Sequence, residues 1–175
     1  MNFAVSAIGR DRPGIVAAIS GVLLDLGGNI DDSQMSILHG HFAVMLIVSV
    51  PPEVEREELA RRLETVRAEL ELEGLAVSPI DELAAGASPT HVLTVYGADH
   101  PGIVHAVSSA LAAREVNITD LRTRRTEGGE AEPLYMMVLE IVVTGEAEDL
   151  ERELRAVGAQ ATVEVSLREL SSESL

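Results

Sequence analysis

A short polar motif that could bind charged groups occurs twice in the chain. Its two copies read Gly9-Arg10-Asp11-Arg12-Pro13-Gly14-Ile15-Val16 and Gly97-Ala98-Asp99-His100-Pro101-Gly102-Ile103-Val104. The similarity continues, since residues 9–32 match residues 97–120 at 12 positions. Chance agreement over such a window would give roughly one or two matches. The chain is therefore an internal duplication.

The motif offers partners for both ends of an amino acid. The carboxylate of Asp11 can hold an ammonium group, and the start of the helix that follows favours a carboxylate. The amide of Asn29, at the start of the next strand, adds donors and an acceptor. A purely structural interpretation has equal weight: Asp11 caps the helix, Pro13 and Gly14 shape its first turn, and Asn29 forms a left-handed turn.

Hydrophobic periodicity predicts the same order of elements, βαββαβ, in both copies. In the first copy, strands are expected at 2–8, 30–38, 42–50 and 75–80, and helices over 15–26 and 59–70. In the second copy, strands are expected at 91–96, 117–126, 134–143 and 161–167, and helices at 102–114 and 147–157. A longer turn is expected around Gly128-Gly129.

This order predicts an α+β fold with two ferredoxin-like modules, each an antiparallel sheet with both helices on one face. The first module is expected at 1–83, a linker at 84–90, the second module at 91–170 and a flexible tail at 171–175. Such sheets leave edge strands open, so the edges are expected to pair within the chain or with a second chain. A homo-oligomer is expected, with a dimer favoured.

The composition argues against several classes of function. The chain has 13 Arg, no Lys and 29 acidic residues, for a net charge of −16, which disfavours direct binding to nucleic acid or to an anionic membrane. It has no Cys and no Trp. Without a secretory signal pattern or an apolar run long enough to span a bilayer, a cytoplasmic location is expected.

Other chemistry-bearing residues point to weaker sites. His39 and His41 could form a metal pair, but no third ligand lies nearby in the sequence, so a solvent-exposed turn is expected and no metal. His100 could contact an anionic ligand or titrate near neutral pH.

Eight Glu and four Arg in 53–73 suit a solvated helix face. Hydrolase and kinase signatures are missing, so neither a cofactor nor enzymatic activity is expected.

The doubled G-x-D-x-P-G-I-V motif, followed by a helix and Asn-Ile, resembles the ACT-domain family of amino-acid-responsive regulatory modules over nearly all the chain. The tandem pair is most similar to the glycine cleavage system transcriptional repressor family and to the regulatory part of formyltetrahydrofolate deformylase. The resemblance implies a ligand site at an interface between modules. Its residues would be Gly9, Asp11, Pro13, Gly14, Asn29 and Ile30 in the first copy, and Gly97, Asp99, Pro101, Gly102, Asn117 and Ile118 in the second. His100 is added to the second site because of its own chemistry and not because of the resemblance.

We therefore expect a non-enzymatic regulator that binds an amino acid, of the glycine or serine class, and modulates a partner protein such as a transcription activator or a metabolic enzyme. The alternative is a regulatory or scaffolding subunit that docks a metabolic enzyme without sensing a ligand. Arg10 and Arg12 of the first copy become Ala98 and His100 in the second. The two sites are therefore expected to differ, and one of them is expected to have lost the ability to bind a ligand.

Overall fold

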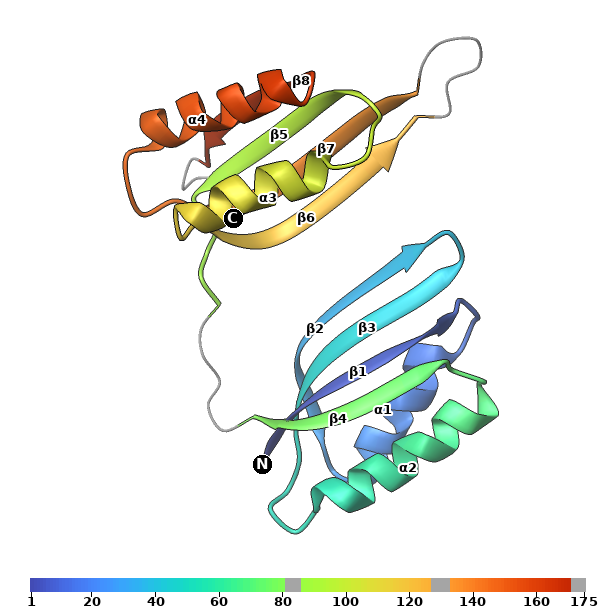
Figure 1. Cartoon of the computed structure of the whole chain (residues 1–175). Helices are drawn as coiled ribbons and strands as arrows, with labels where there is room; N and C mark the ends of the chain where they lie inside the picture. Colours follow the sequence, from blue (N-terminus) through green and yellow to red (C-terminus); the bar gives the residue numbers. More distant parts are fainter. Residues whose placement is uncertain (81–85, 127–132, 171–175) are drawn as a thin grey trace. The chain divides into compact units, whose positions relative to one another are not determined.

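The computed structural model describes residues 1–80, 86–126 and 133–170, and the chain divides into two compact units, Met1–Ala84 and Ala85–Leu175 (Figure 1). Each unit has the predicted βαββαβ order. The turn expected around Gly128-Gly129, the start of the expected linker and the expected tail lie outside the described residues.

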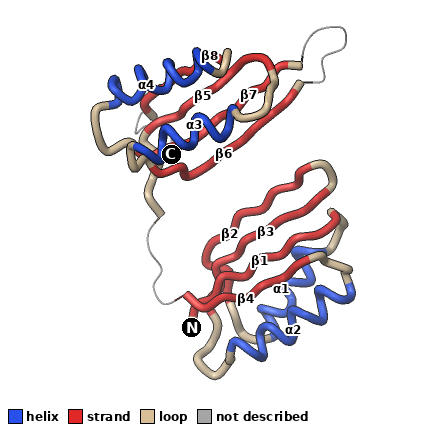
Figure 2. Tube along the Cα trace, in the orientation of Figure 1, coloured by secondary structure: helices blue, strands red, loops and turns tan. Residues whose placement is uncertain are grey.

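The first unit is a four-stranded antiparallel sheet in the order β2-β3-β1-β4. Its two helices cover the same face of the sheet, as Figures 1 and 2 show. The elements are β1 (Asn2–Arg10), α1 (Ile15–Asp25), β2 (Asn29–Leu38), β3 (His41–Ser49), α2 (Arg56–Glu69) and β4 (Gly74–Ile80).

The second unit repeats this topology with the strand order β6-β7-β5-β8, which confirms the ferredoxin-like fold in both halves. Its elements are β5 (His91–Ala98), α3 (Ile103–Ala113), β6 (Asn117–Arg125), β7 (Leu134–Val142), α4 (Ala147–Gln160) and β8 (Val163–Glu169). Strand β8 begins two residues later than expected, because α4 continues to Gln160. No helix in the described part of the chain is long and apolar enough to cross a membrane.

Each unit has its own hydrophobic core between the helices and one face of the sheet. In α1, the buried residues Ile15, Ile19 and Leu23 are spaced by one turn, so they form a single stripe. The equivalent stripe of α3 consists of Ile103, Val107 and Leu111. Alternate strand residues complete the cores, among them Phe3, Val5, Phe42 and Val44 in the first and Leu93, Val95, Met137 and Leu139 in the second.

Strand β2 is an edge strand that its own unit covers poorly. Every residue from Asp31 to Leu38 is exposed, although Met35 and Ile37 point to the same side of the sheet as the buried Val44 and Phe42 of β3. Met35 is 51% exposed and Ile37 is 48% exposed. An open edge with exposed apolar side chains is a surface on which another strand can pair.

Candidate functional site

The loop of residues 11–14, hereafter the first loop, leads into α1. Helix α1 begins at Ile15, and its N-cap is Gly14 in the left-handed region at φ 99°. Within the described chain no side chain caps this helix end and no acidic residue lies in its first turn. The first backbone N–H groups of a helix have no partner inside the helix, and they carry the positive end of its dipole. This end of α1 therefore suits a carboxylate.

Asp11 lies beside this helix end with an exposed side chain. Its backbone N–H donates to the carbonyl oxygen of Gly40 at 2.9 Å, which ties the loop to the turn between β2 and β3. Among the described residues, the Asp11 carboxylate has no hydrogen-bond or ion-pair partner. The alternative in which Asp11 caps α1 is wrong, because Gly14 occupies the N-cap. Its carboxylate faces solvent, where it can bind an ammonium group.

The first loop and the end of β1 both lie against the turn after α2. The Arg12 guanidinium lies 3.3 Å from the Glu71 carboxylate. Gly9 is buried, and a Cβ at this position would lie 3.1 Å from the Cα of Leu72. Gly9 therefore allows close packing within the unit and is not exposed to a ligand. Pro13 is exposed and precedes α1, whereas the sequence suggested that it lies in the first helical turn.

Asn29 lies at the opposite end of the sheet from the first loop. Asn29 pairs with Ser49 at the end of β3, whereas Arg10, the residue before the loop, pairs with His41 at the start of β3. The eight-residue step along β3 corresponds to about 27 Å. One amino acid cannot contact Asp11 and Asn29 of the same unit, which corrects the expectation that they act together within one copy.

The surroundings of Asn29 also differ from the alternative interpretation of the sequence, in which Asn29 forms a left-handed turn. Its side-chain amide donates to the Asp31 carboxylate at 2.9 Å, and Ser49 donates to the same oxygen at 3.1 Å. The left-handed residue before β2 is Gly27, at φ 68°, and not Asn29. Ile30 packs against the core and contributes to folding.

The loop of residues 99–102, hereafter the second loop, is tied down more completely. The Arg125 guanidinium contacts the Asp99 carboxylate at 2.9 Å, and the Asp99 side chain is only 26% exposed. The backbone N–H of Asp99 donates to the carbonyl oxygen of Pro133 at 3.1 Å. Gly102 is the N-cap of α3 at φ 101°, and Pro101 is exposed beside it.

His100 holds the second loop through both of its ring nitrogens. They face the carbonyl oxygens of Ala161 and Pro101, and these two hydrogen bonds raise the pKa of His100 above 6.5, with a smaller contribution from the charge of Asp99. The expectation that His100 contacts an anionic ligand is not supported, because its ring is engaged by its own unit.

The remaining predicted residues of the second unit repeat the pattern of the first. A Cβ on Gly97 would lie 2.9 Å from the carbonyl oxygen of Thr162, so this glycine also serves close packing. Asn117 pairs with Val142 and lies at the far end of the sheet from the second loop. Ile118 packs against the core.

The sequence did not single out Arg125. It lies past the segment in which the two copies are most alike, and it occupies the place of Ile37. In the first unit, Ile37, Phe42 and Gly9 lie opposite one another in one cross-strand row. In the second unit, the equivalent row consists of Arg125, Tyr135 and Gly97. Extending the repeat alignment through these strands would have found the difference.

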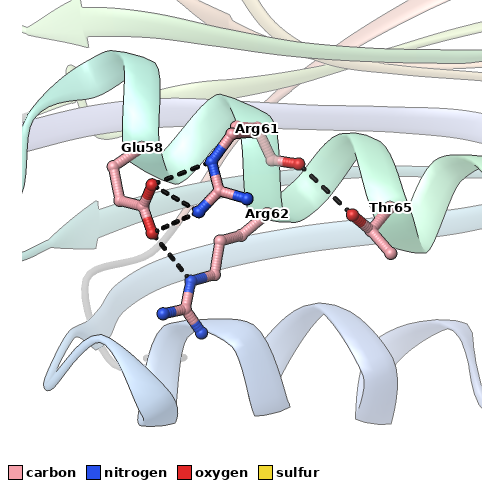
Figure 3. Close-up of polar contacts among 4 residues, drawn as sticks. All are labelled: Glu58, Arg61, Arg62 and Thr65. Atoms are coloured by element: carbon pink, nitrogen blue, oxygen red, sulfur yellow. Dashed lines mark hydrogen bonds and ion pairs between the residues drawn. The ribbon is translucent and has the colours of Figure 1, made fainter.

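The charged outer face of α2 is a weaker candidate for a binding surface. Glu58 accepts hydrogen bonds from Arg62 and Arg61, at distances down to 2.6 Å (Figure 3). These two arginines lower the pKa of Glu58, the bond from Arg62 most strongly. Arg67 pairs with Glu64 in the same way. The face largely satisfies its own charges, as expected for a solvated helix.

A surface depression of about 400 Å³ lies in the second unit. It is lined by residues of β5, β8 and α4, including Tyr96, Arg155, Ala159 and Glu164. Neither the first loop nor the second loop lines it. The first loop is the better candidate because its chemistry matches both charges of an amino acid.

Comparison with protein families identifies the modules. An ACT domain family model matches residues 2–74, and a second ACT domain model matches residues 91–159. The chain belongs to the ACT-domain family. It carries two ACT modules in tandem, and both candidate loops lie within the matched segments.

Curated relatives of this ACT protein are short. A UPF0237 protein from Streptococcus pneumoniae serotype 4 is 41% identical over 49 residues, which are 28% of this chain and 56% of that protein. The match thus spans little more than half of the relative. A UPF0237 protein from Methanocaldococcus jannaschii is 40% identical over 67 residues, which are 38% of this chain and 74% of that protein.

Two solved structures match the whole ACT pair. A protein of unknown function from Galdieria sulphuraria has a TM-score of 0.81 and 26% identity, with 97% of this chain and 98% of that one covered. A protein described as a candidate glycine cleavage system transcriptional repressor has a TM-score of 0.67 and 20% identity, with 98% of each chain covered. The second likeness shows the fold alone.

Proposed function

We propose that this protein is a non-enzymatic regulator that binds an amino acid of the glycine or serine class and thereby modulates a partner protein. The observation that carries the proposal is the exposed Asp11 carboxylate beside the N-terminus of α1, whose N-cap is Gly14. The helix end would receive the ligand carboxylate and Asp11 its ammonium group. Membership of the ACT-domain family supports this assignment.

The ligand site would be completed by a second copy of the chain. In an antiparallel pair of β2 strands, the start of one strand lies beside the end of the other. The end of β2, at Leu38, pairs with His41, which in turn pairs with Arg10 beside the first loop. Such pairing would bring Asn29 of the second copy toward Asp11, although the two residues are far apart within one unit. The dimer would then be two-fold symmetric, with two equivalent sites.

The exposed apolar residues of β2 support pairing at this edge. Met35 and Ile37 are about half exposed, and a second copy that pairs along β2 would cover them. Asp31 holds the Asn29 amide at 2.9 Å, so the side chain that would complete the neighbouring site already has a defined orientation. Ligand binding would therefore favour the paired state over the separate chains.

The regulator would act by changing its affinity for another protein. If the partner binds one assembly state better, reciprocal linkage requires that it also change the affinity for the amino acid. A net charge of −16 disfavours direct contact with DNA, so control of transcription would operate through a protein such as an activator. The likeness in fold to a candidate glycine cleavage system transcriptional repressor is consistent with this route.

A thermal-shift screen of glycine, serine and the other proteinogenic amino acids tests the proposal. A ligand at one hundred times its Kd stabilises the folded protein by about 2.7 kcal/mol, which gives a measurable shift in Tm. We expect a shift with one small amino acid and none with its carboxylate-free amine analogue. If no amino acid shifts the Tm, the sensing function is wrong and a docking subunit becomes the better account.

A further inference from the structure

The two aspartates of the repeated motif are in different electrostatic states. Asp99 lies 2.9 Å from the Arg125 guanidinium, and its side chain is 26% exposed. Asp11 is exposed, and within the described part of the chain its carboxylate contacts no cation. The guanidinium thus stands where the ammonium group of a ligand would stand in the first loop.

The sheet register explains why Arg125 reaches Asp99. Arg125, Tyr135 and Gly97 form one cross-strand row, and Asp99 follows Gly97 by two residues. The corresponding row of the first unit ends in Ile37, which has no charge. The difference between Arg125 and Ile37, at the edge-strand end of the row, therefore decides whether the unit has an internal cation beside the loop aspartate.

We propose that Arg125 is an internal substitute for the ligand ammonium group, so that the second loop binds amino acids more weakly than the first. The inference rests on the proposed function and specifies which loop senses the ligand. Arg125 always carries its charge, so it both occupies Asp99 and repels an incoming ammonium group. The guanidinium side chain is 65% exposed. Its effect is therefore a competition that lowers affinity by about fivefold, and not an absolute block.

The hydrogen bonds around His100 keep the second loop in this arrangement. Its ring bridges the carbonyl oxygens of Pro101 and Ala161, and so joins the loop to the turn before β8. The first unit instead uses the exposed pair Arg12–Glu71. The second module would thus have a structural role, because Arg125 already pairs with its loop aspartate, while the first module responds to the ligand.

An NMR titration of the full chain with glycine, repeated with serine, separates the two loops. Backbone amide signals of residues 11–14 report the first loop, and those of residues 99–102 report the second. In the wild type, the first loop should respond at lower ligand concentration than the second. Arg125→Ile, which installs the first unit's residue, should raise the affinity of the second loop about fivefold and leave the first loop unchanged.

Arg122→Ile is the matched control, because it removes another arginine of β6, one that pairs with Asp120 at 3.0 Å and not with the loop. It should leave both affinities unchanged. Equal affinities of the two loops in the wild type, or an Arg125→Ile variant whose second loop is unaltered, would overturn the inference while leaving amino-acid binding intact. If neither loop responds to glycine or serine in any variant, the inference and the proposed function fail together.

Discussion

Asp11 and Asn29 belong to one repeated segment, residues 9–32, yet they lie at opposite ends of one sheet. The register of β1, β2 and β3 separates them by about 27 Å. Their polar groups can meet at one ligand only if a second module supplies one of them. Under the proposed function, this geometry would link ligand binding to assembly, and single substitutions can test that link.

Replacing Asp11 should weaken amino-acid binding without unfolding the protein. Asp11→Asn removes the charge that would hold the ligand ammonium group, and a hydrogen bond to a charged group contributes about 1.5–3 kcal/mol, or roughly tenfold to hundredfold in Kd. Isothermal titration calorimetry measures the change. Asp25→Asn is the control: it removes the same charge from an exposed residue at the other end of α1 and should leave Kd unchanged.

A charge on the outer edge of β2 should weaken the proposed dimerisation. Met35→Glu places a carboxylate on the edge strand, at a side chain that is 51% exposed, so the module itself should remain folded. We expect the dimer dissociation constant from sedimentation equilibrium to rise at least about tenfold, since a carboxylate is costly to bury.

Met45→Glu is the matched control for this edge. Met45 is 56% exposed but lies in β3, on the sheet face away from the helices. It should leave dimerisation unchanged. If Met45→Glu dissociates the dimer and Met35→Glu does not, the chains associate through the open face of the sheet and the edge assignment is wrong.

The stability contributed by His100 should decrease as the pH rises. Its hydrogen bonds to Ala161 and Pro101 raise its pKa in the folded state above 6.5. A raised pKa contributes stability that is fully present below the unfolded-state value and is lost as the pH rises through the folded-state value. Urea denaturation of wild type and His100→Asn should show a difference near pH 5.5 that shrinks toward about pH 8.5. A difference that does not depend on pH would contradict the role of the protonated ring.

Two glycines of the first unit should respond to alanine in opposite directions. Gly14 has φ 99°, so Gly14→Ala should destabilise the unit by about 1–2 kcal/mol even though no atom lies within 4 Å of the added Cβ. Gly21 lies inside α1 with equally open surroundings, and Gly21→Ala should stabilise by about 0.5–1 kcal/mol. Urea denaturation of each variant provides the test. Equal effects would show that steric space, and not backbone conformation, decides both.

The sequence predicted the order and approximate bounds of the elements because apolar spacing differs between strands and helices. The duplication also showed the same apolar pattern twice. It also located the loop of Asp11. It missed that Gly14 takes the N-cap, since Gly has no side chain to signal that role. It also grouped Asp11 with Asn29, although a helix between two strands returns the chain to the other end of the sheet. The Arg125 contact depends on cross-strand register, which sequence spacing does not reveal.

The most direct test of a shared site is complementation between two defective variants. Asp11→Asn and Asn29→Ala should each weaken amino-acid binding at the first loop when measured alone, because every first-loop site of either dimer lacks one partner. Mixed dimers, formed by refolding the two variants together, should contain one intact first-loop site, so about one first-loop site in four should regain the wild-type affinity. Calorimetric titration counts these sites. If the mixture binds no more ligand than the two variants measured separately, the site is not shared between copies and the central claim is contradicted.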